Sequence, residues 1–162
     1  MDFALSEEQR MLRQMFADFA AKEIAPKAEE IDHEETLPPE MLRGAAEQGL
    51  LGATLPEEYF GAELDRVSYA LLMEAIAGQC VSFAVMLATH VSLATESILA
   101  HGTDAQKEQW LPPMADGEVI GAFTFTEPDA GCDGSAIQTR SVLDGNEPPR
   151  QGQLVWLLVA GS

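Results

Sequence analysis

The stretch from Ser82 to Gly102 is apolar on most sides of a helix, and this constrains the fold of the 162-residue chain more than any other feature. A helix without a polar face must be surrounded by other elements of the protein or by lipid. The most membrane-like segment, Cys80 to Ala100, is long enough to cross a membrane, but it carries polar side chains throughout: Ser82, Thr89, His90, Ser92, Thr95, Glu96 and Ser97. We therefore expect the central helix of a helical domain and no membrane span, with His90 satisfied inside the core.

The helices predicted around this one begin at recognisable capping residues. Ser6 with Gln9, and Thr103 with Gln106, have the spacing of a capping box, in which two side chains satisfy the free N–H groups of a first turn. Asp65 and Ser82 are further candidate N-caps. In chain order, helices are expected from Ser6 to near Pro26, from Pro38 to Gly49, from Asp65 to about Gln79, from Ser82 to Gly102, and from Thr103 to an interruption at Pro112-Pro113.

After Gly117 the pattern changes from helical spacing to alternation. Residues 119–126 alternate as in a β-strand and lead into a turn rich in Pro and Gly. Further strands are expected at 137–143 and 154–159, which are too few to close a barrel or a sandwich. The sequence predicts a mainly α fold, with a helical domain over residues 1–118 followed by an incomplete β-domain over 119–162.

Charge and cysteine content exclude several classes of function. The chain has 27 acidic and 9 basic residues and a formal net charge of −18, so nucleic acids and anionic membranes would be repelled. Cys80 and Cys132 give neither a disulfide framework nor metal-ligand spacing, and no metal site is predicted. The acidic start at Met1 lacks the basic and apolar regions of a secretory signal, so a cytoplasmic protein is expected.

Three segments in order resemble the acyl-CoA dehydrogenase family. They are Leu55-Pro56-Glu57-Glu58-Tyr59, the run from His101 to Pro112, and Thr126-Glu127-Pro128-Asp129-Ala130-Gly131-Cys132-Asp133, which is preceded by Gly121-Ala122-Phe123-Thr124-Phe125. The third segment resembles the flavin-site signature of the family. The likeness extends from about residue 5 to about residue 146.

The resemblance implies an N-terminal helical domain, a middle β-domain and a C-terminal helical bundle, with FAD and an acyl-CoA thioester meeting between them. In such enzymes a carboxylate removes an α-proton, hydride leaves for the flavin, and electrons pass to electron-transferring flavoprotein. That carboxylate lies in the C-terminal bundle, so no catalytic residue is assigned here, and the chain is expected to be an inactive fragment. The alternative is a non-catalytic helical interaction module. Because an apolar helix and open strand edges invite association, a homo-oligomer is expected.

The resemblance also places individual residues. Phe123, Phe125 and Thr126 would lie along the isoalloxazine, Gly131 and Cys132 near the flavin and the thioester, and Trp156 in register on a later strand. Taken by itself, the turn from Thr126 to Gly131 exposes N–H groups and a hydroxyl that suit the flavin's carbonyls. An ordinary hairpin turn has the same local pattern.

Some positions depart from the family pattern. Cys132 stands where serine is usual, and we expect a small, buried, inert thiol that donates weakly. Asp129 and Phe60 replace glycines, and phenylalanine is poorly suited to Phe60's turn if φ is positive there. Leu158 replaces a threonine expected near the flavin.

Overall fold

The computed structural model describes residues 4–139, and its α-helices lie between Glu7 and Ala115. They fall into two compact units, one ending at Ala122 and the other beginning at Phe123. The predicted mainly α fold is confirmed, whereas the assignment of 119–162 to a β-domain remains a prediction. The α-helices are α1 (Glu7–Phe19), α2 (Ala28–Glu34), α3 (Pro39–Glu47), α4 (Arg66–Ala77), α5 (Val81–Ala88), α6 (Glu96–His101) and α7 (Asp104–Ala115).

The first helix begins at its predicted capping box but does not end near Pro26. Ser6 accepts the N–H of Gln9, whose side chain accepts the N–H of Ser6. A π-helical turn (Ala20–Ile24) and a 3-10 turn (Ala25–Lys27) then carry the chain past Pro26 into α2. Because proline lacks an N–H and crowds the carbonyl four residues earlier, the wider turn directly before Pro26 lets the helical path continue. The prediction of an end at this proline was wrong.

The central helix is continuous from Val81 to His101 as α5, a π-helical segment η4 (Thr89–Thr95) and α6. Its N-cap is Cys80, whose backbone is extended, and the predicted cap Ser82 lies inside the first turn. By length and composition this helix could span a membrane, but 50% of its most apolar 18-residue stretch is buried within the structure. Phe83, Leu87 and Val91 are fully buried, which is the behaviour of a core helix.

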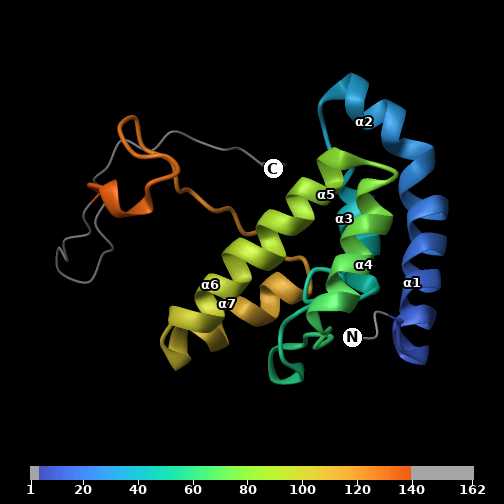
Figure 1. The fold of residues 1–162 in the computed structure, drawn as a ribbon, viewed down its shortest axis with the longest axis horizontal. Helices are drawn as coiled ribbons and strands as arrows, with labels where there is room; N and C mark the ends of the chain where they lie inside the picture. Colours follow the sequence, from blue (N-terminus) through green and yellow to red (C-terminus); the bar gives the residue numbers. More distant parts are fainter. Residues whose placement is uncertain (1–3, 140–162) are drawn as a thin grey trace. The chain divides into compact units, whose positions relative to one another are not determined.

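Neighbouring helices cover this core. α1 packs on α4, and α4 packs on α5, as Figure 1 shows. Phe16 of α1, Leu72 and Ile76 of α4, and Phe83 of α5 belong to one buried cluster. α6 packs on α7, where Leu111 and Ala115 form a smaller cluster with Leu55. The helical unit is therefore held by apolar contacts between elements far apart in sequence.

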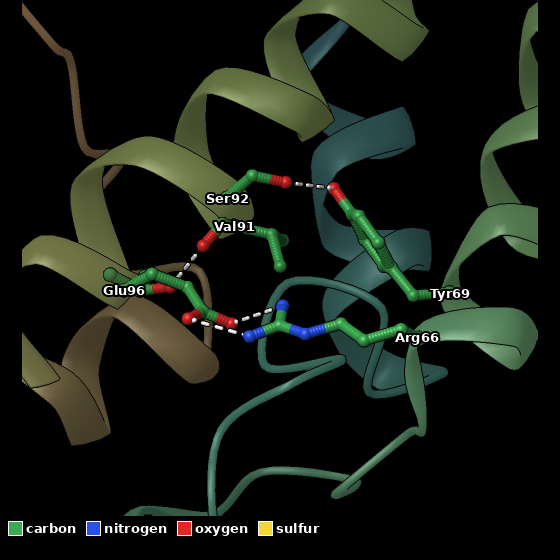
Figure 2. A network of polar contacts seen from close by, with 6 residues as sticks. Arg66, Tyr69, Val91, Ser92 and Glu96 are labelled. Atoms are coloured by element: carbon green, nitrogen blue, oxygen red, sulfur yellow. Dashed lines mark hydrogen bonds and ion pairs between the residues drawn. The ribbon is translucent and has the colours of Figure 1, made fainter. Parts of the chain in front are cut away.

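Two polar links join α4 to the central helix (Figure 2). Arg66 makes a two-pronged contact with Glu96 at 2.8 and 3.1 Å, and this contact lowers the pKa of Glu96. The hydroxyls of Tyr69 and Ser92 lie 2.7 Å apart in a partly buried hydrogen bond. These links fix the register of α4 along the central helix, because each pairs a residue on one helix with one specific partner on the other.

The last helix and the segment after it differ from the prediction. α7 passes through Pro112 and Pro113 and ends at Ala115, where the N–H of Asp116 still bonds to the carbonyl of Pro112 at 3.0 Å. Within the described residues, 119–126 form no strand, because Val119 and Gly121 donate to Pro113 and His90 instead of to a neighbouring strand. The predicted strands beyond Thr139 lie outside the described residues.

Candidate functional site

The candidate site is the loop over residues 123–139, which begins with an aromatic pair. The rings of Phe123 and Phe125 stack with centroids 6.0 Å apart and an interplanar angle of 18°. Phe125 is 44% exposed. A Cβ added to Gly134 would lie 3.1 Å from Cζ of Phe125, so the returning chain passes over the edge of this ring. The loop thus presents an aromatic surface that is open on one side.

A short backbone bridge follows the aromatic pair. The N–H of Glu127 donates to the carbonyl of Ala130 at 2.8 Å, and the N–H of Ala130 donates back at 3.3 Å. Thr126 directly precedes this bridge and Gly131 directly follows it. The structure therefore brings these two predicted site residues to the same end of one tight turn.

The turn presents hydrogen-bond donors. Among the described residues, neither the N–H groups of Gly131 and Cys132 nor the hydroxyl of Thr126 has a hydrogen-bond partner. All three residues are exposed. A ligand carbonyl could take the place of water on such exposed donors, so the turn offers three hydrogen-bond donors in the same loop as the exposed Phe125.

The charges of the loop limit what it can hold. Residues 123–139 contain three acidic groups, Glu127, Asp129 and Asp133, and no Lys or Arg. Hydrogen bonds from the Ser135 hydroxyl and backbone N–H lower the pKa of Asp133, so this carboxylate stays charged. An uncharged ring with carbonyl groups fits this surface, whereas a diphosphate group would be repelled by it. Residues 4–139 hold no group of three or more His, Cys, Asp or Glu side chains arranged for a metal ion.

Most predicted site residues lie in this loop. Phe123 is half-buried, and Phe125, Thr126, Gly131 and Cys132 are exposed. The expectation of a buried thiol at Cys132 was wrong, because Cys132 lies on the open turn whereas Cys80 is buried. Trp156 and Leu158 lie outside the described residues. Sequence reasoning missed Glu127, whose carboxylate binds backbone groups of residues 138 and 139 that no local pattern connects to it.

The prediction that His90 is a satisfied core histidine is confirmed. Its side chain is fully buried, with Nε2 3.1 Å from the Met114 carbonyl and Nδ1 accepting the N–H of Gly121 at 2.9 Å. Burial lowers the pKa of the imidazole. His90 therefore holds the last stretch of the helical unit in place and has no nitrogen left for a ligand.

Comparisons with known proteins agree with the fold of the helical domain. The family model described as acyl-CoA dehydrogenase, N-terminal domain, matches residues 6–118. The short-chain specific acyl-CoA dehydrogenase of Clostridium acetobutylicum is 40% identical over 161 residues, which cover 99% of this chain and 42% of that protein. This chain thus spans about two fifths of the length of such relatives, 41% and 42% in two cases.

Solved structures give the same result. A chain in the structure of the electron transferring flavoprotein of Acidaminococcus fermentans is 40% identical, with a TM-score of 0.83, covering 91% of this chain and 39% of that one. A glutaryl-CoA dehydrogenase from Mycobacterium smegmatis in complex with FADH2 is 31% identical, with a TM-score of 0.81, covering 87% of this chain and 36% of that one. Both similarities therefore cover most of this chain but less than half of the chain with which it is compared.

Proposed function

The chain belongs to the acyl-CoA dehydrogenase family, and on that basis we propose that its 123–139 loop contacts FAD in the α,β-dehydrogenation of an acyl-CoA thioester. The observation that carries the proposal is the exposed ring of Phe125 in the same loop as the donors of Thr126, Gly131 and Cys132, which have no hydrogen-bond partner within residues 4–139. A relative binds FADH2, which supports a flavin as the ligand.

The residues of the loop fit the ring system of a flavin. The isoalloxazine is flat and aromatic, so one face can pack on Phe125. Its pyrimidine carbonyls can accept hydrogen bonds from the N–H groups of Gly131 and Cys132 and from the hydroxyl of Thr126. Since residues 123–139 are acidic, we assign the diphosphate of FAD to residues outside this loop. When bound, FAD supplies the hydride acceptor of the reaction.

We further propose that the thioester lies next to Cys132. The resemblance puts this residue near both flavin and substrate, and its exposed position on the turn supports contact. Electron-transferring flavoprotein is the proposed electron acceptor, supported by the likeness to a chain solved in the structure of such a flavoprotein. The names of the relatives support a short-chain or dicarboxylic acyl-CoA as substrate.

We propose that these residues bind the flavin but do not catalyse the reaction by themselves. By resemblance the catalytic base of the family lies in a C-terminal bundle, and we assign it to none of residues 4–139. A positioned base contributes about 10²- to 10⁴-fold in rate. The test supplies the purified chain with FAD, an artificial electron acceptor and acyl-CoA esters, and follows reduction of the acceptor against a blank without protein. Bound flavin without turnover supports the proposal, whereas turnover that copurifies with the chain contradicts its catalytic part.

The same preparation separates the proposal from its alternative, a non-catalytic helical interaction module. A folded chain that stays colourless and ignores added FAD would favour the module. The exposed apolar positions of the central helix, Val81, Val85 and Leu93, support association of the isolated chain in either case.

A further inference from the structure

Glu127 is the one buried polar residue within 123–139, where Thr124 is half-buried and the other polar residues are exposed. Glu127 is 8% exposed, and within 123–139 only Glu127 and Ala130 are buried. A carboxylate is rarely buried unless each oxygen has a partner, because burial removes its hydration. The partners of Glu127 therefore indicate what its burial achieves.

Both oxygens of the carboxylate bind consecutive backbone groups from the far end of the loop. Oε2 accepts the N–H of Gln138 at 2.8 Å, and Oε1 accepts the N–H of Thr139 at 2.8 Å. These bonds lower the pKa of Glu127 and keep it ionised. Hydrogen bonds to an ionised acceptor are stronger than those between neutral groups. Glu127 thus closes a ring of the chain from residue 127 to residue 139.

The residues inside this ring include the proposed flavin contacts. The backbone of Glu127 pairs with Ala130, and Asp133 accepts the N–H of Ser135 at 3.0 Å, so Gly131 and Cys132 are held between two fixed turns. Thr126 precedes Glu127 directly. One side chain therefore joins the start of the turn to the segment that follows it.

We propose that Glu127 is a positioning residue of the flavin site: its carboxylate closes the loop so that Thr126, Gly131 and Cys132 present their donors in one fixed arrangement. The inference rests on the proposed function. Glu127 touches neither flavin nor substrate in this account and acts through the backbone that it holds. Glutamine at this position offers one acceptor oxygen for two N–H groups, and one of them would lose its partner.

The first test compares Glu127→Gln with Asp129→Asn, which removes the same charge from an exposed residue of the same turn. Glu127→Gln should weaken FAD binding roughly tenfold, as expected for losing one hydrogen bond to a charged group. It should also change the visible circular dichroism of the bound flavin, which reports how the ring is held. Asp129→Asn should bind FAD within about twofold of the wild type. If Glu127→Gln leaves both affinity and spectrum unchanged, the inference is wrong while the flavin site itself stands.

The second test needs no flavin. Amide hydrogen exchange, followed by NMR on the full chain, should show protection of the Gln138 and Thr139 amides in the wild type and its loss in Glu127→Gln. The helical amides and the thermal midpoint should not change. Rapid exchange of both amides in the wild type would overturn the positioning role whether or not FAD binds. A wild type that protects these amides but ignores FAD would instead contradict the proposed function alone.

Discussion

The backbone N–H of Gly121 donates a 2.9 Å hydrogen bond to Nδ1 of His90 on the buried face of the central helix. Because Nδ1 accepts, Nε2 carries the proton and donates to the carbonyl of Met114 at 3.1 Å. A Cβ on residue 121 would lie 2.5 Å from both Ala94 Cβ and Met114 Cε, so only glycine allows this approach. One neutral histidine thus joins the central helix, α7 and the segment that leaves the helical unit.

Replacing His90 by phenylalanine should destabilise the helical unit strongly. The change keeps an aromatic ring but leaves the partly buried N–H of Gly121 without its partner. The Met114 carbonyl loses its bond to His90 but still accepts the N–H of Gly117 at 3.2 Å, so we expect a loss of about 1 to 3 kcal/mol. Urea unfolding followed by circular dichroism measures the free energy of unfolding. His101→Phe, at the exposed end of α6, is the control for replacing a histidine. A His90→Phe variant as stable as the control would contradict this account of His90.

The stability of the chain should fall as the pH drops below about 6.5, the ordinary pKa of histidine. Burial lowers the pKa of His90 in the folded state, so the unfolded chain binds this proton first. The contribution of neutral His90 to the free energy of unfolding is therefore complete above the pKa that the histidine has in the unfolded chain. It is lost as the pH falls from there towards the lower pKa of His90 in the folded protein. The midpoint of thermal unfolding, measured between pH 8 and pH 5, should fall with decreasing pH, and this fall should be smaller in His90→Gln than in the wild type. Equal slopes in both proteins would exclude His90 as the source.

Replacing Phe60 by glycine should stabilise the protein. Phe60 has φ 61°, the condition under which phenylalanine was expected to be poorly suited to this turn. Phe60 is 66% exposed, so little burial is lost. Glycine adopts this left-handed backbone conformation without steric cost, although it also has greater freedom in the unfolded chain. The net effect should raise the free energy of unfolding by about 1 kcal/mol. Phe60→Ala removes the ring but keeps the backbone cost and should not stabilise. Equal urea midpoints for the two variants would show that the backbone is not strained.

The isolated chain should self-associate through the central helix. Val81, Val85 and Leu93 are 66%, 44% and 41% exposed, and no charged side chain lies between Cys80 and Thr95. A double change, Val85→Glu with Leu93→Glu, should shift the chain to monomer in analytical ultracentrifugation at micromolar concentration. Val67→Glu, an exposed apolar position on α4, is the matched control. A wild type that is already monomeric would contradict this expectation.

Local signals predicted the helices well, and non-local partners explain what they missed. Capping residues act within one turn, so the starts at Ser6, Asp65 and Thr103 were predictable. Prolines were expected to end a helix at Pro26 and to interrupt one at Pro112-Pro113. A π-helical turn instead precedes Pro26, and α7 runs through both later prolines to Ala115. Alternation over 119–126 predicted a strand, although a strand also needs a partner, and His90 and Pro113 take the N–H groups instead.

The candidate site also has a part that local sequence signals could predict and a part that depends on residues farther along the chain. Phe125, Thr126, Gly131 and Cys132 lie in one short motif, so their place in a common turn could be predicted from the sequence. Glu127 could not be singled out, because its carboxylate acts on backbone groups eleven and twelve residues away. The exposure of Cys132 also depends on how the loop closes and not on the motif itself.

Titration of the purified chain with FAD tests the central claim most directly. Flavin fluorescence and visible circular dichroism should report saturable binding of one FAD per chain, because the proposed site packs the flavin ring on Phe125 and donates the N–H groups of the turn to its carbonyls. Phe125→Ala and Thr126→Ala should each weaken that binding, while Trp110→Ala, which removes an exposed aromatic residue from α7, should not. A chain that unfolds cooperatively on heating, yet leaves the fluorescence and dichroism of FAD unchanged, would contradict the assignment of residues 123–139 to a flavin site.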